Sequence, residues 1–304
     1  MSLSQGTISI ERMCRLARVS RAGYYRFWRA HAPRQHDTQV RDAIQCIALA
    51  NGRHRGYRYI THQLRRELGL VVNHKCVQRL MREDNLLCLR QRSFVPHTTD
   101  SRHRWRIVSN LARGLQPSAP DQLWVADITY IRLQEEFAYL AVVLDAYSRF
   151  AIGWAMADHL RASLALAALA MAIEQRRPVW GSLIHHSDRG VQYACGEYSA
   201  LLKAHGITAS MSRLGNPYDN AKAESFMKTL KAEQVDGTLY RDHHEAARCI
   251  GTFIEQIYNT QRLHSALGYR PPAEFEALHR LSWPGVGDAA RGQGLGAAHA
   301  QSSS

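Results

Sequence analysis

The stretch Leu123-Trp-Val-Ala-Asp-Ile-Thr-Tyr130 decides the fold, because it is an apolar, strand-like run that carries an acidic residue, Asp127, near its centre. Two more acidic residues follow in structured settings. Asp188 ends the run Leu183-Ile-His-His-Ser-Asp188, and Glu224 lies inside a strongly helical stretch, with 35 residues between the two acids. We therefore expect two strands and one helix to bring three carboxylates together.

The sequence around this run alternates between strand and helix patterns. We expect strands over 123–133, 137–145, 150–157, 182–187 and 207–212, and helices over 162–177, 197–205, 219–234 and 242–263. Short turns join the first three strands, as in an antiparallel meander. The order βββαβαβαα predicts an α/β, RNase H-like core with a mixed five-stranded sheet over residues 120–280.

The three acids suit phosphodiester chemistry. Cleavage by water or by a 3′-hydroxyl requires a deprotonated nucleophile, stabilisation of the pentacovalent charge and an in-line leaving oxygen. Two Mg²⁺ ions about 4 Å apart meet these needs when carboxylates bridge them. Asp127, Asp188 and Glu224 are therefore our candidate catalytic residues and metal ligands. A strand aspartate taken alone would instead be read as a turn or cap residue.

The predicted helix around Glu224 also carries amide and cationic side chains. At 100° per residue, Asn220, Glu224, Lys228 and Lys231 lie within about 80° of one another, while Phe226 faces the core. We expect the two lysines to hold a DNA phosphate beside the metals. Asn220 is expected to fix either Glu224 or a phosphate. The alternative is an ordinary Glu–Lys pair on a helix surface.

Basic charge is concentrated in the N-terminal part of the chain. Residues 1–120 contain 22 lysine and arginine residues against 7 aspartate and glutamate residues, whereas residues 121–304 contain 17 against 19. Of the 22 basic residues, 21 are arginine, which suits bidentate contact with phosphates. We expect this part to bind nucleic acid; the alternative is a merely solvated basic surface.

Residues 1–33 contain a first helix-turn-helix pattern. The apolar positions of its first helix share one face: Ile10, Met13, Leu16 and Ala17. After a short turn, Ser20 is suited to cap a second helix. Arg21 and Arg26 of that second helix face outward and are candidate DNA contacts.

Residues 34–90 contain a second pattern, preceded by a helix predicted over about 38–50. Gly69 is suited to end one helix and Asn73 to cap the next. The buried stripe of that last helix is expected at Val77, Leu80 and Met81. Its outward side chains are of the kind that a recognition helix presents to a major groove, and the candidate DNA contacts are Lys75, Gln78, Arg79 and Arg82, beside His74.

The remaining segments have weak periodicity. Residues 91–119 predict a basic linker lying along DNA, and residues 281–304, rich in Gly, Ala and Ser, predict a disordered tail. There is no apolar run of about 18 residues and the N-terminus is polar, so we expect no membrane span and no signal peptide. Six cysteines without a Cys-x-x-Cys pair suit a reducing compartment and argue against a Cys-based zinc site.

Two pairs of polar residues in the C-terminal part have open roles. Asp145 is a fourth acid on a predicted core strand, and we interpret it as structural, paired with Arg149, rather than as a metal ligand. Arg262 and His264 precede a Gly-Tyr-Arg-Pro-Pro turn. They either contact DNA or pack structurally, and the residues alone do not separate these alternatives.

Side chains next to Asp188 have two interpretations. His185, His186 and Tyr193 flank it and are expected to orient its loop or contact DNA. A zinc site that includes Cys195 is the alternative, although the spacing is wrong for a zinc finger.

Five motifs together resemble the integrase-core transposases of IS3-family insertion sequences. They are Trp124-Val-Ala-Asp-Ile-Thr-Tyr-Ile131, Leu144-Asp-Ala-Tyr-Ser-Arg149, His186-Ser-Asp-Arg-Gly-Val-Gln-Tyr193, Gly215-Asn-Pro-Tyr-Asp-Asn-Ala-Lys-Ala-Glu-Ser-Phe226 and Tyr258-Asn-Thr-Gln-Arg-Leu-His-Ser-Ala-Leu-Gly268 with Pro271-Pro272. The resemblance spans roughly residues 8–278. It implies an RNase H-like fold and a D-D-E triad at Asp127, Asp188 and Glu224. It also implies use of Mg²⁺ or Mn²⁺, recognition of terminal inverted repeats, and cleavage followed by strand transfer.

One feature departs from the pattern of that family. Its members are often made by ribosomal frameshifting as fusions with an upstream segment that carries a leucine zipper, and no sustained heptad repeat occurs here. We therefore interpret the chain as a downstream-frame product that works with an upstream-frame partner or fusion segment.

The leading hypothesis is a DNA transposase that acts on double-stranded DNA as a homo-oligomer in the bacterial cytoplasm, at the nucleoid. A second hypothesis is a truncated, non-enzymatic regulator that binds element ends and represses transposition. A third is an RNase H-like nuclease without joining activity. The two helix-turn-helix patterns argue against the third, because a structure-specific nuclease needs no sequence reader.

Overall fold

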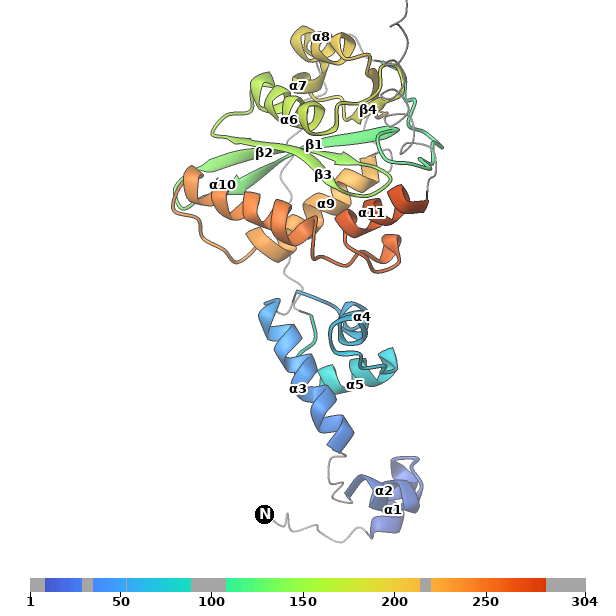
Figure 1. Cartoon of the computed structure of the whole chain (residues 1–304). Helices are drawn as coiled ribbons and strands as arrows, with labels where there is room; N and C mark the ends of the chain where they lie inside the picture. Colours follow the sequence, from blue (N-terminus) through green and yellow to red (C-terminus); the bar gives the residue numbers. More distant parts are fainter. Residues whose placement is uncertain (1–8, 29–34, 53, 89–107, 214–219, 283–304) are drawn as a thin grey trace, which may run out of the picture.

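The computed structural model describes residues 9–28, 35–52, 54–88, 108–213 and 220–282. Its N-terminal part is entirely helical, and the helices are α1 (Ile10–Leu16), α2 (Arg21–Trp28), α3 (Gln35–Ala50), α4 (Tyr57–Leu68) and α5 (His74–Glu83). The α/β part follows and contains the sheet (Figure 1). The predicted tail beyond residue 282 lies outside the described residues.

The α/β part is built on one mixed sheet with the strand order β3-β2-β1-β4-β5. The strands are β1 (Leu123–Arg132), β2 (Phe137–Asp145), β3 (Ala151–Ala157), β4 (Ile184–Ser187) and β5 (Thr208–Met211). β1, β2 and β3 pair antiparallel, whereas β4 pairs parallel with both β1 and β5. This is the expected five-stranded RNase H-like sheet, with an antiparallel meander on one side and two parallel strands on the other.

Helices cover both faces of the sheet (Figure 1). One face packs against α6 (Ala162–Arg176), α7 (Val191–Ala194) and α8 (Gly196–Ala204), and the other against α9 (Ala221–Leu230) and α10 (His243–Thr252). Along β1, Leu123 and Val125 belong to the α9 core, whereas Trp124 and Ala126 belong to the α6 core. Because side chains alternate along a strand, Asp127 faces α9.

All five strands were predicted within two residues at each end. The last two predicted helices end differently, because α9 passes into a π-helical turn (Lys231–Val235) and α10 into another (Phe253–Tyr258). A 3₁₀ turn (Ser265–Leu267) and helix α11 (Pro272–Ser282) complete the part, and α11 was not predicted. Among the described residues, no helix is both long enough and apolar enough to span a membrane.

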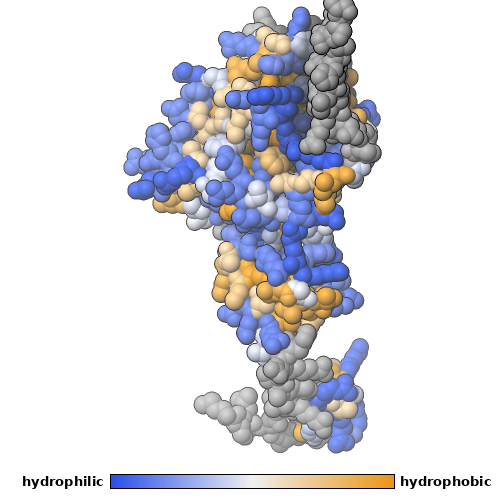
Figure 2. All heavy atoms as spheres, viewed as in Figure 1, coloured by the Kyte–Doolittle hydropathy of each residue, from blue (hydrophilic) through white to orange (hydrophobic). Residues whose placement is uncertain are grey.

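Helices α3, α4 and α5 enclose a small core of their own, whose fully buried members include Ile44, Ile60, Leu64 and the predicted stripe Val77, Leu80 and Met81. Gly69 ends α4 in the left-handed conformation, as expected. Asn73 caps α5 by accepting the Lys75 backbone N–H at 2.8 Å. The face of this unit in Figure 2 shows hydrophobic as well as hydrophilic side chains, so it is not a uniformly charged surface.

The α1–α2 pair matches its prediction only in part. Ser20 accepts the Gly23 backbone N–H at 2.9 Å, as a cap of α2. The predicted apolar face of α1 is not buried, since Leu16 is 72% exposed and Cys14 is the buried residue of this helix. Two short helices leave an apolar face open unless a further element covers it.

The predicted linker, residues 91–119, is described only in its last part. Residues 91–107 lie outside the described residues. Beyond them, Val108 and Ala112 pack against the two opposite cores of the sheet. The Leu111 backbone N–H donates to Ser210 Oγ at 2.8 Å. The end of the segment is therefore packed against the α/β part, and its predicted path along DNA stays a prediction.

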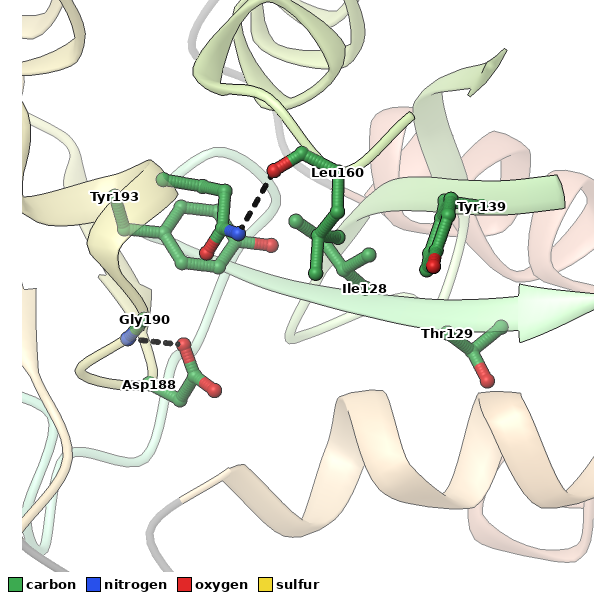
Figure 3. A pocket seen from close by; sticks show the side chains of 8 residues that line it. Ile128, Thr129, Tyr139, Leu160, Asp188, Gly190 and Tyr193 are labelled. Carbon is green, nitrogen blue, oxygen red and sulfur yellow. Dashed lines mark hydrogen bonds between the residues drawn. The ribbon is translucent and has the colours of Figure 1, made fainter. Parts of the chain in front are cut away.

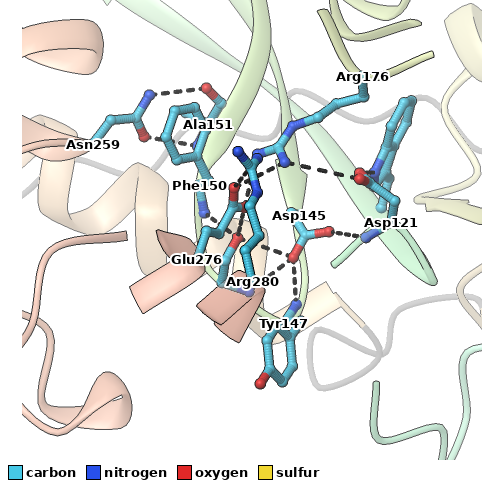
Figure 4. A network of polar contacts seen from close by, with 11 residues as sticks. Asp121, Asp145, Tyr147, Phe150, Ala151, Arg176, Asn259, Glu276 and Arg280 are labelled. Carbon is cyan, nitrogen blue, oxygen red and sulfur yellow. Dashed lines mark hydrogen bonds and ion pairs between the residues drawn. The ribbon is translucent and has the colours of Figure 1, made fainter. Parts of the chain in front are cut away.

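Asp145 is held by backbone donors at the end of β2 (Figure 4). Its carboxylate accepts the N–H of Asp121 at 2.7 Å, of Tyr147 at 2.9 Å and of Ser148 at 2.8 Å. Burial raises the pKa of Asp145, and these amide donors oppose that rise. The structural interpretation stands, but the expected partner was wrong: no ion pair with Arg149 occurs among the described residues.

Helix α11 is joined to the rest of the fold by a buried glutamate (Figure 4). Glu276 accepts two hydrogen bonds from Arg176 of α6, at 2.7 and 2.9 Å. The Ser148 hydroxyl donates to the same carboxylate at 2.6 Å. Arg176 also stacks over the Phe150 ring. This network connects α6, the turn after β2 and α11.

Candidate active site

Asp127 occupies the middle of β1, where its Oδ1 accepts the Ile128 backbone N–H at 2.9 Å. Burial, followed by the negative charge of Asp188, raises the pKa of Asp127 to about 7. Glu224 acts in the same direction, whereas the Ile128 N–H and Lys231 oppose the rise. The three predicted carboxylates therefore lie within electrostatic reach of one another.

Asp188 directly follows β4. The register of β4 with β1 pairs His186 with Val125. Extended by two residues, this register places Asp188 beside Asp127 on the same face of the sheet. The Gly190 backbone N–H donates to Asp188 Oδ1 at 2.8 Å, and this bond turns the carboxylate back toward its own loop (Figure 3).

Glu224 reaches the site from the first turn of α9. Asn220 precedes this helix, and its Nδ2 donates to the Ala126 carbonyl at 2.9 Å. Ala126 is the residue before Asp127, so this one hydrogen bond fastens the start of α9 beside the central acid. Asn220 is buried, and within the described residues its Oδ1 has no hydrogen-bond partner.

The three acids do not form a closed ligand cage in this structure. Within the described residues, no three His, Cys, Asp or Glu side chains are arranged closely enough to hold a metal ion. Like charges repel, and each carboxylate has turned to a local donor: the backbone amides of Ile128 and Gly190, and the Lys228 ammonium. Lys228 pairs with Glu224, and the negative charges of Asp188 and Glu224 still raise the pKa of Asp127.

The two predicted lysines of the α9 region occupy different settings. Lys228 is largely exposed, and its Nζ lies 3.4 Å from Glu224 Oε2, one helical turn away. Lys231 is half-buried, with its Nζ 4.1 Å from the centroid of the Tyr130 ring. Burial lowers the pKa of Lys231, and the carboxylates of Asp236 and Asp127 oppose that fall. Only Lys228 is placed as an open phosphate contact.

The candidate DNA contacts of the helical part are mostly at the surface. Lys75, Arg82, Arg21 and Arg26 are exposed, and Gln78 is half-buried. Arg79 differs, because its guanidinium pairs with Glu83 at 2.9 Å and lies 3.7 Å from Asp37.

The histidines before Asp188 are packed inside the protein. The two ring nitrogens of His186 lie 2.9 Å from Ser210 Oγ and 3.0 Å from Ser212 Oγ. His185 Nε2 lies 3.0 Å from the Tyr198 hydroxyl, and burial lowers the pKa of His185 to about 3. These rings fasten β4 to its neighbours, so the expectation that they contact DNA is wrong. Cys195 instead caps α8.

Arg262 and His264 belong to a buried cluster and do not face solvent together. Arg262 donates to Glu233 at 2.8 Å and at 3.0 Å. Burial lowers the pKa of His264 to about 3, and the charges of Arg262 and Arg55 act in the same direction. The structure thus favours packing over the DNA-contact alternative.

Two features next to Asp188 were not anticipated. A Cβ on Gly190 would lie 3.0 Å from Asp188 Oδ1, so a larger residue there would press on the candidate ligand. The Tyr193 hydroxyl is buried without a hydrogen-bond partner among the described residues. Burial raises its pKa, and the charge of Asp188 adds to the rise. The Asp-Arg-Gly motif could have indicated the close contact of Gly190 with Asp188. The burial of the Tyr193 hydroxyl is visible only in the fold.

Comparison with known proteins places this geometry in a family. Two models of an integrase core domain match residues 117–217 and 205–272, and a model of an HTH-like domain matches residues 35–94. The transposase InsF for insertion sequence IS3fB of Escherichia coli (strain K12) is 36% identical over 276 residues, which cover 90% of this chain and 95% of that protein. The chain belongs to the IS3-family transposases.

The chain is also similar to a second insertion-element protein and to a solved structure. An uncharacterized 31 kDa protein of insertion element IS600 from Shigella sonnei is 39% identical over 275 residues, covering 89% of this chain and all of the relative. Among solved structures, the catalytic core domain of HTLV-2 integrase in complex with magnesium aligns with a TM-score of 0.40 and 14% identity, over 53% of this chain and 99% of that one. As a family member, the chain is a DNA transposase, an enzyme of the polynucleotidyl-transferase class.

Proposed function

We propose that this transposase cuts and joins DNA at Asp127, Asp188 and Glu224, after its helical part has bound the terminal inverted repeats of its element. The observation that supports the site is the closeness of the three acids: burial raises the pKa of Asp127 to about 7, and the negative charges of Asp188 and Glu224 add to that rise. Such a cluster is stable as a set of anions only when cations join it.

The donor set fits two divalent ions of the Mg²⁺ or Mn²⁺ type. Its ligands are all carboxylate oxygens, which these hard cations prefer, and Asn220 Oδ1 is a buried acceptor without a partner among the described residues. Asp127, on a rigid central strand, would hold the ions together with Asp188 and Glu224. When bound, the ions supply activation of the nucleophile and stabilisation of charge at phosphorus.

The remaining roles belong to side chains around the acids. The hydrogen bond from Asn220 to the Ala126 carbonyl keeps α9 against β1. Lys228, exposed beside Glu224, is placed to hold a phosphate of the DNA backbone. Lys75, Gln78 and Arg82 of α5, with Arg21 and Arg26 of α2, are proposed to bind DNA farther from the chemistry. Arg79 is a weaker candidate because acidic neighbours already occupy it.

The site is tested by incubating the full chain with the ends of its own element and Mg²⁺, then sequencing the DNA junctions. Asp127→Ala should abolish cleavage and joining while leaving binding to the ends within about threefold of wild type. Glu174→Gln, which changes an exposed acid on α6, is the matched control and should retain activity. Unchanged joining by the Asp127→Ala protein contradicts the proposed site.

The same assay separates the alternatives. A truncated regulator would bind the ends and join none of them in the presence of Mg²⁺. A nuclease would leave hydrolysed ends without junctions. We propose that the active form is a homo-oligomer that holds two element ends, assembled with or without an upstream-frame partner, in the cytoplasm at the nucleoid.

A further inference from the structure

A buried ion cluster joins the α3–α5 unit to the α/β part. Arg55, just before α4, places its Nη1 2.6 Å from Glu233 Oε2, and the two side chains are only 5% and 7% exposed. Arg262 donates to both oxygens of the same carboxylate, with Nη2 2.8 Å from Glu233 Oε1 and Nε 3.1 Å from Oε2. One glutamate of the α/β part is therefore held between an arginine of the helical unit and an arginine of the C-terminal segment.

Burying this cluster costs free energy, because its charged groups lose their hydration. Two guanidinium groups share one carboxylate, so a positive charge remains in a buried place. Burial lowers the pKa of Arg55, Glu233 opposes that fall, and Arg262 adds to it. A buried ion pair often stabilises no more than apolar residues of the same volume, but it fixes one arrangement of the groups around it. The main effect of the cluster is therefore to fix how the α3–α5 unit lies against the α/β part, and not to raise the free energy of unfolding.

Glu233 is part of the helix that carries the candidate active site. It lies in the π-helical turn Lys231–Val235, which continues α9 without a break in helical conformation. Glu224 is nine residues earlier, about 13 Å along a helix axis. Lys231, two residues before Glu233, packs on Tyr130 of β1. A shift of Glu233 would therefore be transmitted to Lys231 and along the helix to Glu224.

Two further contacts cross the same junction, but they are more exposed. Arg66 of α4 pairs with Glu274 of α11, and its side chain is 45% exposed. His62 stacks on Tyr269 with the ring centroids 3.5 Å apart. Exposed ion pairs contribute about 0–1 kcal/mol, so Arg66 provides a matched control for Arg55.

We propose that Glu233 is a positioning residue through which Arg55 couples the DNA-reading α3–α5 unit to helix α9. The placement of that unit then sets the placement of Glu224 and Lys231. This rests on the proposed function only for its consequence in catalysis; the coupling itself is a property of the fold. Helices interrupted by π-turns are frequent at functional sites, which agrees with a control point at residues 231–235.

Hydrogen–deuterium exchange of the full chain without DNA or metal tests the coupling alone. In Arg55→Met and Glu233→Gln, the amides of residues 228–236 should exchange at least threefold faster than in wild type, while the α5 amides keep their rates. Arg66→Met should leave both regions unchanged. Wild-type exchange at 228–236 in both cluster variants overturns the proposal, whatever the enzyme does to DNA. Glu233→Gln keeps the side-chain shape and serves if Arg55→Met fails to fold.

Joining of pre-cleaved element ends tests the consequence. At saturating DNA and Mg²⁺, Arg55→Met should lower the turnover about tenfold, with the Kd for a duplex of the element end within threefold of wild type. Arg55→Lys should recover part of the turnover, because an ammonium group still reaches the carboxylate. An equal loss of binding and turnover would mean that Arg55 is only structural and overturns the positioning role. Inactivity of the wild-type chain would instead count against the proposed function, and the exchange rates still decide the coupling.

Discussion

At the scale of single residues, the site depends on where each acid is held. Asp127 is half-buried on the central strand β1, Asp188 is turned by the Gly190 amide, and Glu224 is next to Lys228. The sequence predicted these acids because their segments have clear strand and helix patterns. It did not predict the orientation of Asp188, because that follows from one backbone hydrogen bond in a loop.

The raised pKa of Asp127 predicts a pH-dependent stability. The carboxyl ionises near pH 3.8 in the unfolded chain and near pH 7 in the folded one, so its contribution to folding is lost between these values as pH rises. The loss is on the order of 4 kcal/mol at most. Asp127→Asn should therefore show a smaller fall in Tm between pH 5 and pH 8 than wild type, measured in EDTA. Parallel Tm curves for the two proteins would refute the burial argument.

At the scale of elements, the sheet packs closely on α6. A Cβ on Gly153 of β3 would lie 2.2 Å from the Ala168 carbonyl oxygen of α6. Gly153→Ala must push the strand from the helix, and we expect a loss of about 3 kcal/mol in the free energy of unfolding by urea. Gly196→Ala, where the added Cβ meets nothing within 4 Å, should change it by less than about 1 kcal/mol. Equal losses in the two variants would contradict this packing.

Helix α11 is held by a charge network that the sequence did not reveal. Its buried residues are Pro272 and Glu276, so it has no apolar stripe by which a helix is recognised. The partner of Glu276 is Arg176, 100 residues away. Ion pairs between residues so far apart in the sequence, such as this one and Arg55–Glu233, can be seen only once the fold is known. The five strands, in contrast, were predictable from local periodicity.

Removing the carboxylate of Glu276 should lower the free energy of unfolding. Glu276→Gln takes the nearest carboxylate from the buried Arg176 guanidinium and leaves Asp121 Oδ2, 3.8 Å from Nη1, as its remaining ion pair. We expect a loss of about 3 kcal/mol in the free energy of unfolding. Glu274→Gln, in the same helix but with a side chain that is 34% exposed, should cost about 1 kcal/mol or less. Urea unfolding followed by circular dichroism measures both, and a stable Glu276→Gln protein would show that the network is dispensable.

At the scale of the whole molecule, the charge distribution separates the part proposed to bind DNA from the part proposed to cut and join it. The excess of arginine lies in residues 1–120, and the three acids lie in the α/β part. The double variant Lys75→Ala/Arg82→Ala should lower the slope of log Kd against log salt for duplex DNA by about 2, since each lost phosphate contact removes about 0.9. Arg79→Ala, whose guanidinium is paired with Glu83, should change the slope less. An unchanged slope in the double variant would exclude α5 from the DNA interface.

The proposed chemistry requires that Asp127, Asp188 and Glu224 form one metal site. Binding of Mn²⁺ to the full chain at pH 8, followed by electron paramagnetic resonance, measures this without any need for DNA cleavage. The wild-type chain should bind Mn²⁺, and Asp127→Asn, Asp188→Asn and Glu224→Gln should each weaken binding at least tenfold, while Glu174→Gln binds like wild type. Equal Mn²⁺ affinity in the wild-type chain and the three variants would contradict the account.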